Sequence, residues 1–180
     1  SEGESWPLAQ DGPDGYDIVG WIAQRPWCDG RVAMRGGSYR GMVQWQTLKQ
    51  EPDALVTVVP TAAVHPGWDY PNPSGIFLSY AARWLAFVNG AASQSSLFGD
   101  NDYWRQKYLK LHQEHRPFAE LDELSGLPAR VFEQWIEHPY YDDYWREMNP
   151  GPDDYARIDL PILTITGYFD GDQPGAMKYY

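Results

Sequence analysis

The chain has little cysteine and few basic residues. Cys28 is the single cysteine among 180 residues, so no disulfide can form within the chain, and no zinc-finger spacing of Cys and His occurs. Lysine and arginine together number 14 against 25 aspartates and glutamates, which gives a formal net charge of −11 and a pI near 4.6. Because nucleic-acid binding requires Lys and Arg to neutralise phosphates, this balance excludes a nucleic-acid partner.

Long apolar runs are also lacking. None approaches the roughly 20 residues that a membrane-spanning helix needs, and the opening SEGESWPLAQ is acidic where a signal peptide is basic and then apolar. We therefore expect a soluble, cytoplasmic protein with no membrane partner, although one cysteine leaves the redox compartment open. The chain starts without a helix or strand signal and stops at MKYY inside a predicted helix, so we expect a piece of a longer protein.

The residues that are present are typical of a globular domain with a core, at 43% hydrophobic and 22% charged. Nine tryptophans and thirteen tyrosines are many for this length. Such amphipathic rings favour large pockets or partner surfaces as well as cores. The aromatic content names no ligand and leaves a homo-oligomer open.

The most informative segment is RVAMRGGSYRGMVQWQ, residues 31–46. A short apolar run meets a glycine pair, then Ser38, then a helix-like stretch. A serine on a tight strand-to-helix turn has its oxygen exposed above a sheet edge, and flanking glycines let the backbone crowd the turn. Ser38 is therefore the first candidate for a nucleophile.

Helix and strand patterns alternate around this serine. In chain order the spacing predicts a helix at 16–24, a strand at 32–34, a helix at 42–50 and a strand at 55–59. This βαβ alternation implies an α/β fold with a mainly parallel sheet and helices on its faces.

The pattern then changes to helices without a convincing strand. The predicted helices are 76–88, 103–111, 128–136 and 141–148. Residues 159–171 (DLPILTITGYFDG) restore a β-branched strand that runs into a polar loop. We therefore predict an α/β core in residues 1–63 and 156–180, with a helical insertion at 64–155 where a lid or cap would lie.

A serine hydroxyl is a weak nucleophile until a base, usually an imidazole oriented by a carboxylate, takes its proton. Asp170 is the stronger carboxylate candidate because it follows a predicted strand, and α/β sheets assemble their sites at the carboxyl ends of strands. Plain structural interpretations stay open: Ser38 as a small residue in a glycine turn, and Asp170 as a solvated turn aspartate.

Four separated blocks resemble one known family. In chain order they are PWCDGRVAM, GGSYRG with QW behind it, HPYYDDYW and GYFDG. They are similar to the family of cocaine esterase, X-Pro dipeptidyl-peptidases, glutaryl acylases and α-amino acid ester hydrolases, whose serine lies in Gly-x-Ser-Tyr-x-Gly. The resemblance implies an α/β-hydrolase core with an inserted helical cap, truncated here at both ends. It also implies cleavage of an ester or amide in a small-molecule or short peptide substrate, with no metal or other cofactor.

The same resemblance implies roles for individual residues. Ser38 would attack the carbonyl, Asp170 would be the triad acid, and the backbone N–H of Tyr39 would be one oxyanion donor. The family's second donor, a tyrosine hydroxyl upstream of the elbow, would then lie before residue 1. The family histidine follows the aspartate, so we expect the base outside this chain and the 180 residues alone to be inactive. All four histidines precede Asp170: His65, His112, His115 and His138.

Two residues beside Asp170 are candidate substrate contacts. Relatives that hydrolyse α-amino acid esters hold the substrate ammonium with carboxylates near Asp172, and Tyr168 is expected to line the acyl pocket. A helix-capping or solvated aspartate and a core tyrosine are the alternatives. The block HPYYDDYW, with Asp142, Asp143 and Trp145, is interpreted as cap architecture. Ester, amide and X-Pro peptide substrates all stay open, and the competing hypothesis is a non-catalytic binding module on a hydrolase scaffold.

Overall fold

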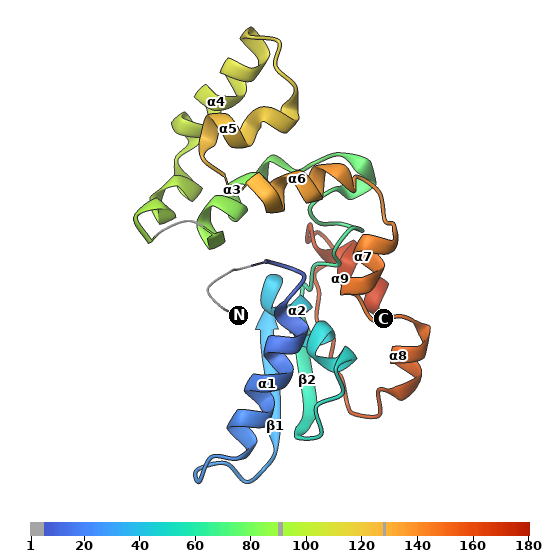
Figure 1. Cartoon of the computed structure of the whole chain (residues 1–180). Helices are drawn as coiled ribbons and strands as arrows, with labels where there is room; N and C mark the ends of the chain where they lie inside the picture. Colours follow the sequence, from blue (N-terminus) through green and yellow to red (C-terminus); the bar gives the residue numbers. More distant parts are fainter. Residues whose placement is uncertain (1–5, 90–91, 128) are drawn as a thin grey trace.

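The computed structural model of the chain describes residues 6–89, 92–127 and 129–180 (Figure 1). One end of the molecule holds two strands with their helices, and the other end holds a group of helices drawn in green to orange. Residues 1–5 and the predicted helix start at Pro128 lie outside the described residues.

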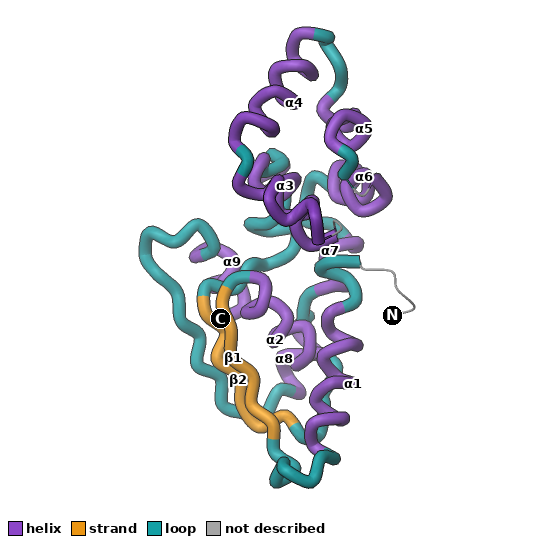
Figure 2. The backbone as a smooth tube through the Cα atoms, turned by 90° about the vertical axis from the view of Figure 1, so that its left-hand side faces the viewer, coloured by secondary structure: helices purple, strands orange, loops and turns teal. Residues whose placement is uncertain are grey.

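The strands form a parallel pair joined by a helix. β1 (Val32–Gly37) pairs with β2 (Leu55–Thr61), and α2 (Tyr39–Lys49) is the crossover that parallel neighbours require. α1 (Asp11–Ala23) packs on α2, and Figure 2 shows both helices on the same side of the strands. The predicted α/β fold and the strand–helix–strand order are therefore confirmed.

A third extended segment runs beside β2. Ile162 and Ile165 form isolated parallel bridges with Val58 and Thr61, so β2 lies between β1 and this segment (Figure 2). The strand predicted within 159–171 is thus only partly formed. Prolines explain the interruption, because Pro60 in β2 and Pro161 at the start of the segment have no N–H to donate to a ladder.

Helices make up most of the chain between β2 and this segment. They are α3 (Ser79–Asn89), α4 (Asn101–Gln113), α5 (Leu121–Ser125), α6 (Ala129–Glu137), α7 (Asp143–Met148) and α8 (Pro152–Arg157). Short 3₁₀ turns join them at Pro73–Gly75, Ala92–Gly99 and Phe118–Glu120. α9 (Gln173–Tyr179) then returns to the strands. No strand is assigned among the described residues of 64–155.

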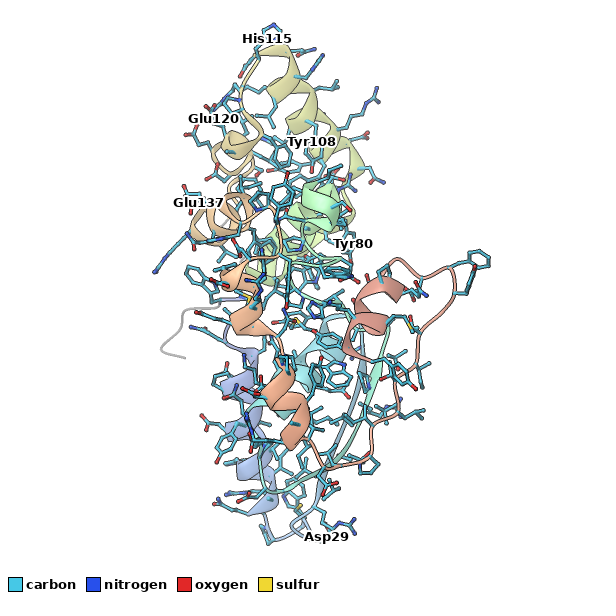
Figure 3. All side chains as sticks on the ribbon, turned by 90° about the vertical axis from the view of Figure 1, so that its right-hand side faces the viewer. Asp29, Tyr80, Tyr108, His115, Glu120 and Glu137 are labelled. Atoms are coloured by element: carbon cyan, nitrogen blue, oxygen red, sulfur yellow. The ribbon has the colours of Figure 1, made fainter. Side chains whose placement is uncertain are left out.

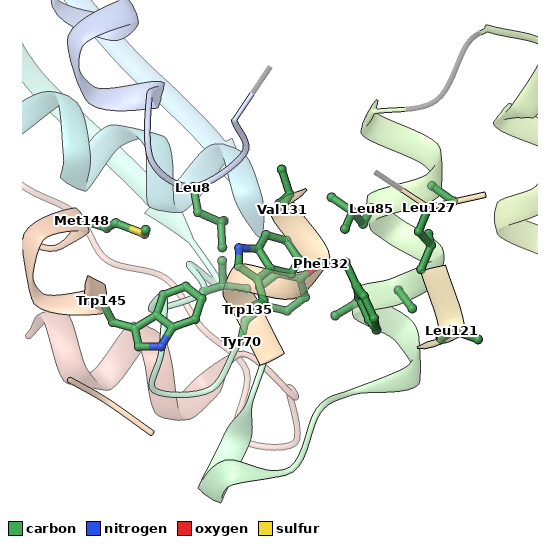
Figure 4. Packing of buried hydrophobic residues seen from close by; sticks show 14 of the residues in the cluster. Leu8, Tyr70, Leu85, Leu121, Leu127, Val131, Phe132, Trp135, Trp145 and Met148 are labelled. Atoms are coloured by element: carbon green, nitrogen blue, oxygen red, sulfur yellow. The ribbon is translucent and has the colours of Figure 1, made fainter. Parts of the chain in front are cut away.

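Two hydrophobic clusters hold these parts together. The larger contains fully buried aromatic side chains of the helices, among them Trp104, Phe132 and Trp135. Phe132 and Trp135 are labelled in Figure 4. The smaller lies against the strands and includes Trp45, whose ring stacks on Tyr179 at 4.8 Å. α2 joins the two clusters, because its Met42 belongs to the larger and its Trp45 to the smaller. The helix that follows Ser38 is therefore anchored on both sides.

Candidate active site

Ser38 occupies a sharp turn between β1 and α2. Its backbone has φ 56° and ψ −124°, a conformation that residues other than glycine rarely adopt. Three bonds hold the turn: the Ser38 N–H donates to the Thr61 carbonyl at 2.9 Å, and the Ser38 carbonyl accepts from the N–H groups of Gly41 and Met42. Because these last two bonds already belong to the helix, α2 begins at Tyr39, three residues earlier than predicted.

Two of the glycines around Ser38, Gly36 and Gly41, are required by close packing. A Cβ at Gly36 would lie 2.6 Å from the Cβ of Arg40, and a Cβ at Gly41 would lie 2.9 Å from that of Ala63. The glycine pattern in the sequence thus has a steric cause: the strand end, the helix start and the segment after β2 meet with no space for side chains.

The hydroxyl of Ser38 contacts a carboxylate 134 residues away in sequence. Ser38 Oγ donates to Asp172 Oδ2 at 3.3 Å. Burial, and then the charge of Asp170, raise the pKa of Asp172 above its usual range, and the bond from Ser38 partly opposes this shift. Asp170 itself is exposed, and its Oδ1 accepts the backbone N–H of Asp172 at 3.0 Å. The structure therefore brings Asp172 against Ser38 and gives Asp170 a bond to the backbone of its own loop.

A cavity of about 700 Å³ opens beside Ser38. It lies where the helical part meets the strands. Tyr80, one of its lining residues, is labelled in Figure 3 between His115 at one end of the molecule and Asp29 at the other. Seven of its lining residues are aromatic: Tyr39, Trp68, Tyr70, Tyr80, Trp84, Tyr140 and Tyr141. Two acids, Asp69 and Asp172, also line it, and its described lining includes no lysine, arginine or histidine.

Tyr168 does not take part in this wall. Its side chain is 84% exposed, and among the described residues its ring packs on the neighbouring Phe169 at 5.0 Å, which is itself 95% exposed. Both residues lie in the turn after the 162–165 segment, where the described residues do not cover them. The acyl-pocket role predicted for Tyr168 thus receives no support from its position, whereas Ser38, Tyr39 and Asp172 share one cavity.

Asp69 is a lining residue that the sequence analysis missed. It is 8% exposed, and its carboxylate accepts two backbone N–H groups, from His65 at 2.8 Å and from Gly175 at 2.6 Å. Burial raises the pKa of Asp69 to about 7. A Cβ at Gly175 would lie 2.1 Å from this carboxylate, so glycine is required there. The motif HPGWDYPNP has no periodicity that marks a buried acid; its one signal is an aspartate among aromatic and proline residues.

Comparison with known proteins assigns the chain to a family. The sequence pattern of the X-Pro dipeptidyl-peptidase family (S15) matches residues 1–180. The chain belongs to this family. It is 28% identical over 184 residues to cocaine esterase from Rhodococcus sp. (strain MB1 Bresler), which covers 95% of this chain and 32% of that protein. The chain therefore spans about a third of the length of this curated relative.

Solved structures of the same group share the fold of this S15 chain. A CocE/NonD family hydrolase from Staphylococcus aureus superposes with a TM-score of 0.65 at 18% identity, over 98% of this chain and 27% of that one. An α-amino acid ester hydrolase gives a TM-score of 0.60 at 21% identity, over 93% of this chain and 29% of that one. The predicted α/β-hydrolase fold is thereby confirmed.

The four histidines of this S15 chain make other contacts than with the serine hydroxyl. His65 is 3% exposed, and burial lowers its pKa to about 4. Its Nδ1 has no hydrogen-bond partner among the described residues, and its ring packs on Tyr141 and Tyr179. His138 Nδ1 lies 2.6 Å from Asp142 Oδ2. His112 and His115 are exposed at the end of α4. None of the four hydrogen-bonds to Ser38.

The block HPYYDDYW holds the helices together. Trp145 is fully buried and donates from Nε1 to the carbonyl of His138 at 2.8 Å, while Asp143 pairs with Arg146 one turn later. Asp142, Asp143 and Trp145 are not among the cavity-lining residues. Tyr140 and Tyr141 of the same block do line the cavity, so the block shapes it through its tyrosines.

Within residues 6–89, 92–127 and 129–180 no group of three or more His, Cys, Asp or Glu side chains is arranged to hold a metal ion. In the same ranges no helix has the length and apolarity needed to cross a membrane.

Proposed function

We propose that this chain carries the nucleophile and substrate cavity of a serine hydrolase, which cleaves an ester or amide, including an X-Pro peptide, through an acyl-enzyme. The observation that carries the proposal is Ser38 itself: a serine in a left-handed backbone conformation between a strand and a helix, with its hydroxyl beside a 700 Å³ cavity. A conformation that costs free energy persists where the surrounding structure enforces it, and such positions cluster at active sites.

The proposed reaction assigns one task to each group. Ser38 Oγ attacks the carbonyl carbon, its proton passes to a histidine outside residues 1–180, and Asp170 orients that imidazole. The N–H of Tyr39 donates to the developing oxyanion; it is the first N–H of α2 and has no helical acceptor of its own. Without the base, the 180 residues alone form no acyl-enzyme at a useful rate. No metal takes part in this chemistry.

The charge of the cavity favours a substrate with an ammonium group. Both oxygens of Asp69 already accept backbone N–H groups, whereas the carboxylate of Asp172 accepts one N–H or O–H group, from Ser38. Among the described lining residues, Asp172 is therefore the carboxylate that keeps an oxygen without a hydrogen-bond donor. Because it touches the nucleophile, a cation held by it lies next to the scissile carbonyl, as the α-ammonium of an amino-acid ester or peptide does. The structural relative named α-amino acid ester hydrolase supports this assignment.

Covalent labelling tests the nucleophile. The full-length gene product is treated with a fluorophosphonate probe, and we expect Ser38→Ala to abolish labelling. Ser74→Ala is the matched control, because Ser74 lines the same cavity and is also a non-glycine residue at positive φ. Labelling that survives in Ser38→Ala would overturn the proposal.

A non-catalytic binding module is the second candidate. It is favoured by the direct bond between Ser38 and Asp172, with none of the four histidines at the hydroxyl. This alternative predicts that the wild-type protein takes up no probe, while an amino-acid ester or amide binds at the cavity and Asp172→Asn weakens that binding.

A further inference from the structure

A chain of hydrogen bonds connects the segment before α1 to the residue after Ser38. The Tyr39 hydroxyl donates to Asp11 Oδ1 at 2.5 Å, and Asp11 Oδ2 accepts the Leu8 N–H at 3.0 Å. The Leu8 carbonyl in turn accepts from Gln46 Nε2 at 2.5 Å. This series of hydrogen bonds therefore begins at Tyr39 and ends at Gln46, both on α2, and Asp11 and Leu8 connect these two positions.

The intermediate residues are fixed in place. Leu8 is fully buried and has φ 74°, a backbone conformation that a non-glycine residue keeps only where its surroundings enforce it. α1 approaches α2 too closely for side chains at two positions, because a Cβ at Gly12 would lie 2.8 Å from the Gln46 carbonyl oxygen and a Cβ at Gly15 2.0 Å from Thr47 Oγ1. The position of Asp11 relative to α2 is thus determined by backbone packing.

Tyr39 is the residue whose N–H faces the reaction in the proposed function. Its ring lines the cavity and packs on Trp84 with the centroids 5.0 Å apart. The ring contacts Trp84 and its hydroxyl bonds Asp11, so the side chain cannot turn without losing one of these contacts. The direction of the Tyr39 N–H follows from the same backbone torsions that orient this ring.

We propose that Asp11 is a positioning residue for catalysis: by holding the Tyr39 hydroxyl it orients the adjacent N–H that stabilises the oxyanion. Asp11 does not line the cavity, so in this role it acts on the oxyanion donor through its bond to the Tyr39 hydroxyl. The inference rests on the proposed function and extends it to a residue 27 positions before the nucleophile, on another helix.

The test uses the full-length gene product and a p-nitrophenyl ester, with active sites titrated by the fluorophosphonate probe. We expect Asp11→Ala to lower kcat per titrated site by about ten- to a hundredfold with KM nearly unchanged, because small misplacements of a catalytic group cost rates of this order. Tyr39→Phe should lower kcat to a similar extent. The double variant should lose no more kcat than Asp11→Ala alone, since both single changes break the Asp11–Tyr39 hydrogen bond, and the bond from the Leu8 N–H to Asp11 is lost in Asp11→Ala and in the double variant alike.

Asp14→Ala is the matched control. Asp14 lies in the same first turn of α1, is exposed and makes no side-chain hydrogen bond with a described residue. The kcat of the Asp14→Ala variant should therefore equal that of the wild type. A merely structural role of Asp11 would lower the number of titrated sites and leave kcat per site unchanged, which overturns the inference, as do additive losses in the double variant. If Asp11→Ala does not fold, Tyr39→Phe alone decides: wild-type kcat per site contradicts the inference. Fluorophosphonate labelling that survives in Ser38→Ala would show that the proposed function itself is wrong, which separates that outcome from a failure of the inference about Asp11.

Discussion

The two turns that meet at Ser38 are held in different ways. The turn after β1 has three backbone hydrogen bonds and two glycines, Gly36 and Gly41, that admit no side chain, and the buried helix α2 follows it directly. The loop that brings Asp172 is largely exposed from Gly167 to Gly171, and bonds within the loop, such as that between Asp170 and the Asp172 N–H, hold it. The nucleophile is therefore set by the scaffold, whereas the position of the acids depends on a few local contacts.

The largest expected effect separates the two acids of the exposed loop. We expect Asp170→Asn to lower kcat by about 10⁴-fold, the size of loss seen when the acid of a Ser-His-Asp triad loses its charge. Asp172→Asn should instead raise KM for amino-acid esters by about ten- to a hundredfold, as the loss of a charged hydrogen bond does.

Steady-state kinetics of the full-length gene product with an aminoacyl ester and its deaminated analogue measure both variants. The analogue is the control, because it has no ammonium for Asp172 to bind and its KM should not respond. The reverse pattern, with kcat lost in Asp172→Asn and kept in Asp170→Asn, would assign the triad acid to Asp172, the carboxylate that contacts Ser38.

The second effect concerns His65, in the segment after β2, which packs against the turn of Ser38. Burial lowers the pKa of His65 to about 4 from 6.5, so its contribution to stability is present above pH 6.5 and is lost as pH falls toward 4, by about 3 kcal/mol. Asp69 acts oppositely: its pKa is raised to about 7, so its contribution is present at low pH and is lost as pH rises through 7.

Replacing His65 by Phe removes the contribution of the histidine to the pH dependence of stability and leaves that of Asp69. On acidification from pH 7 to pH 4, His65→Phe should lose about 3 kcal/mol less free energy of unfolding than the wild type, as measured by urea denaturation. His112→Phe is the control, since His112 is exposed. An unchanged pH dependence in His65→Phe would show that His65 is not held neutral in the folded state.

A smaller effect compares one glycine from each turn. Gly41→Ala places a Cβ 2.9 Å from Ala63 Cβ and 3.1 Å from the Thr61 carbonyl oxygen, and we expect it to lower the free energy of unfolding by about 1–3 kcal/mol. Gly171→Ala meets nothing within 4 Å and should change it by less than about 0.5 kcal/mol. Urea denaturation of the two variants measures the contrast, and equal values would contradict the difference between the turns.

The smallest effect is strain at the nucleophile. Ser38→Gly relieves a positive φ and should stabilise the fold by about 1 kcal/mol, while Ser38→Ala keeps the strained backbone and should not. Thermal unfolding of the two inactive variants gives the comparison. Equal melting temperatures would mean that the backbone at Ser38 stores no strain.

Local patterns predicted the elements that position Ser38. The β-branched run at 55–59 and the short strand at 32–34 lie within β2 and β1, and the helix predicted at 42–50 lies mostly within α2. The interrupted segment at 162–165 was less predictable, because strand pairing depends on the prolines of both partners, which no single-segment pattern includes.

The sequence by itself determined the alternation of strand and helix, the glycine turn that presents Ser38, and the family, since each depends on neighbouring residues or on motif order. Only the tertiary structure decided that Asp172 contacts Ser38, that Asp69 is buried beside the cavity, and that Asp11 holds Tyr39. The physical reason is that each of these contacts joins different elements and depends on the path of the loops and the spacing of packed helices. Spacing along one segment carries no information about either.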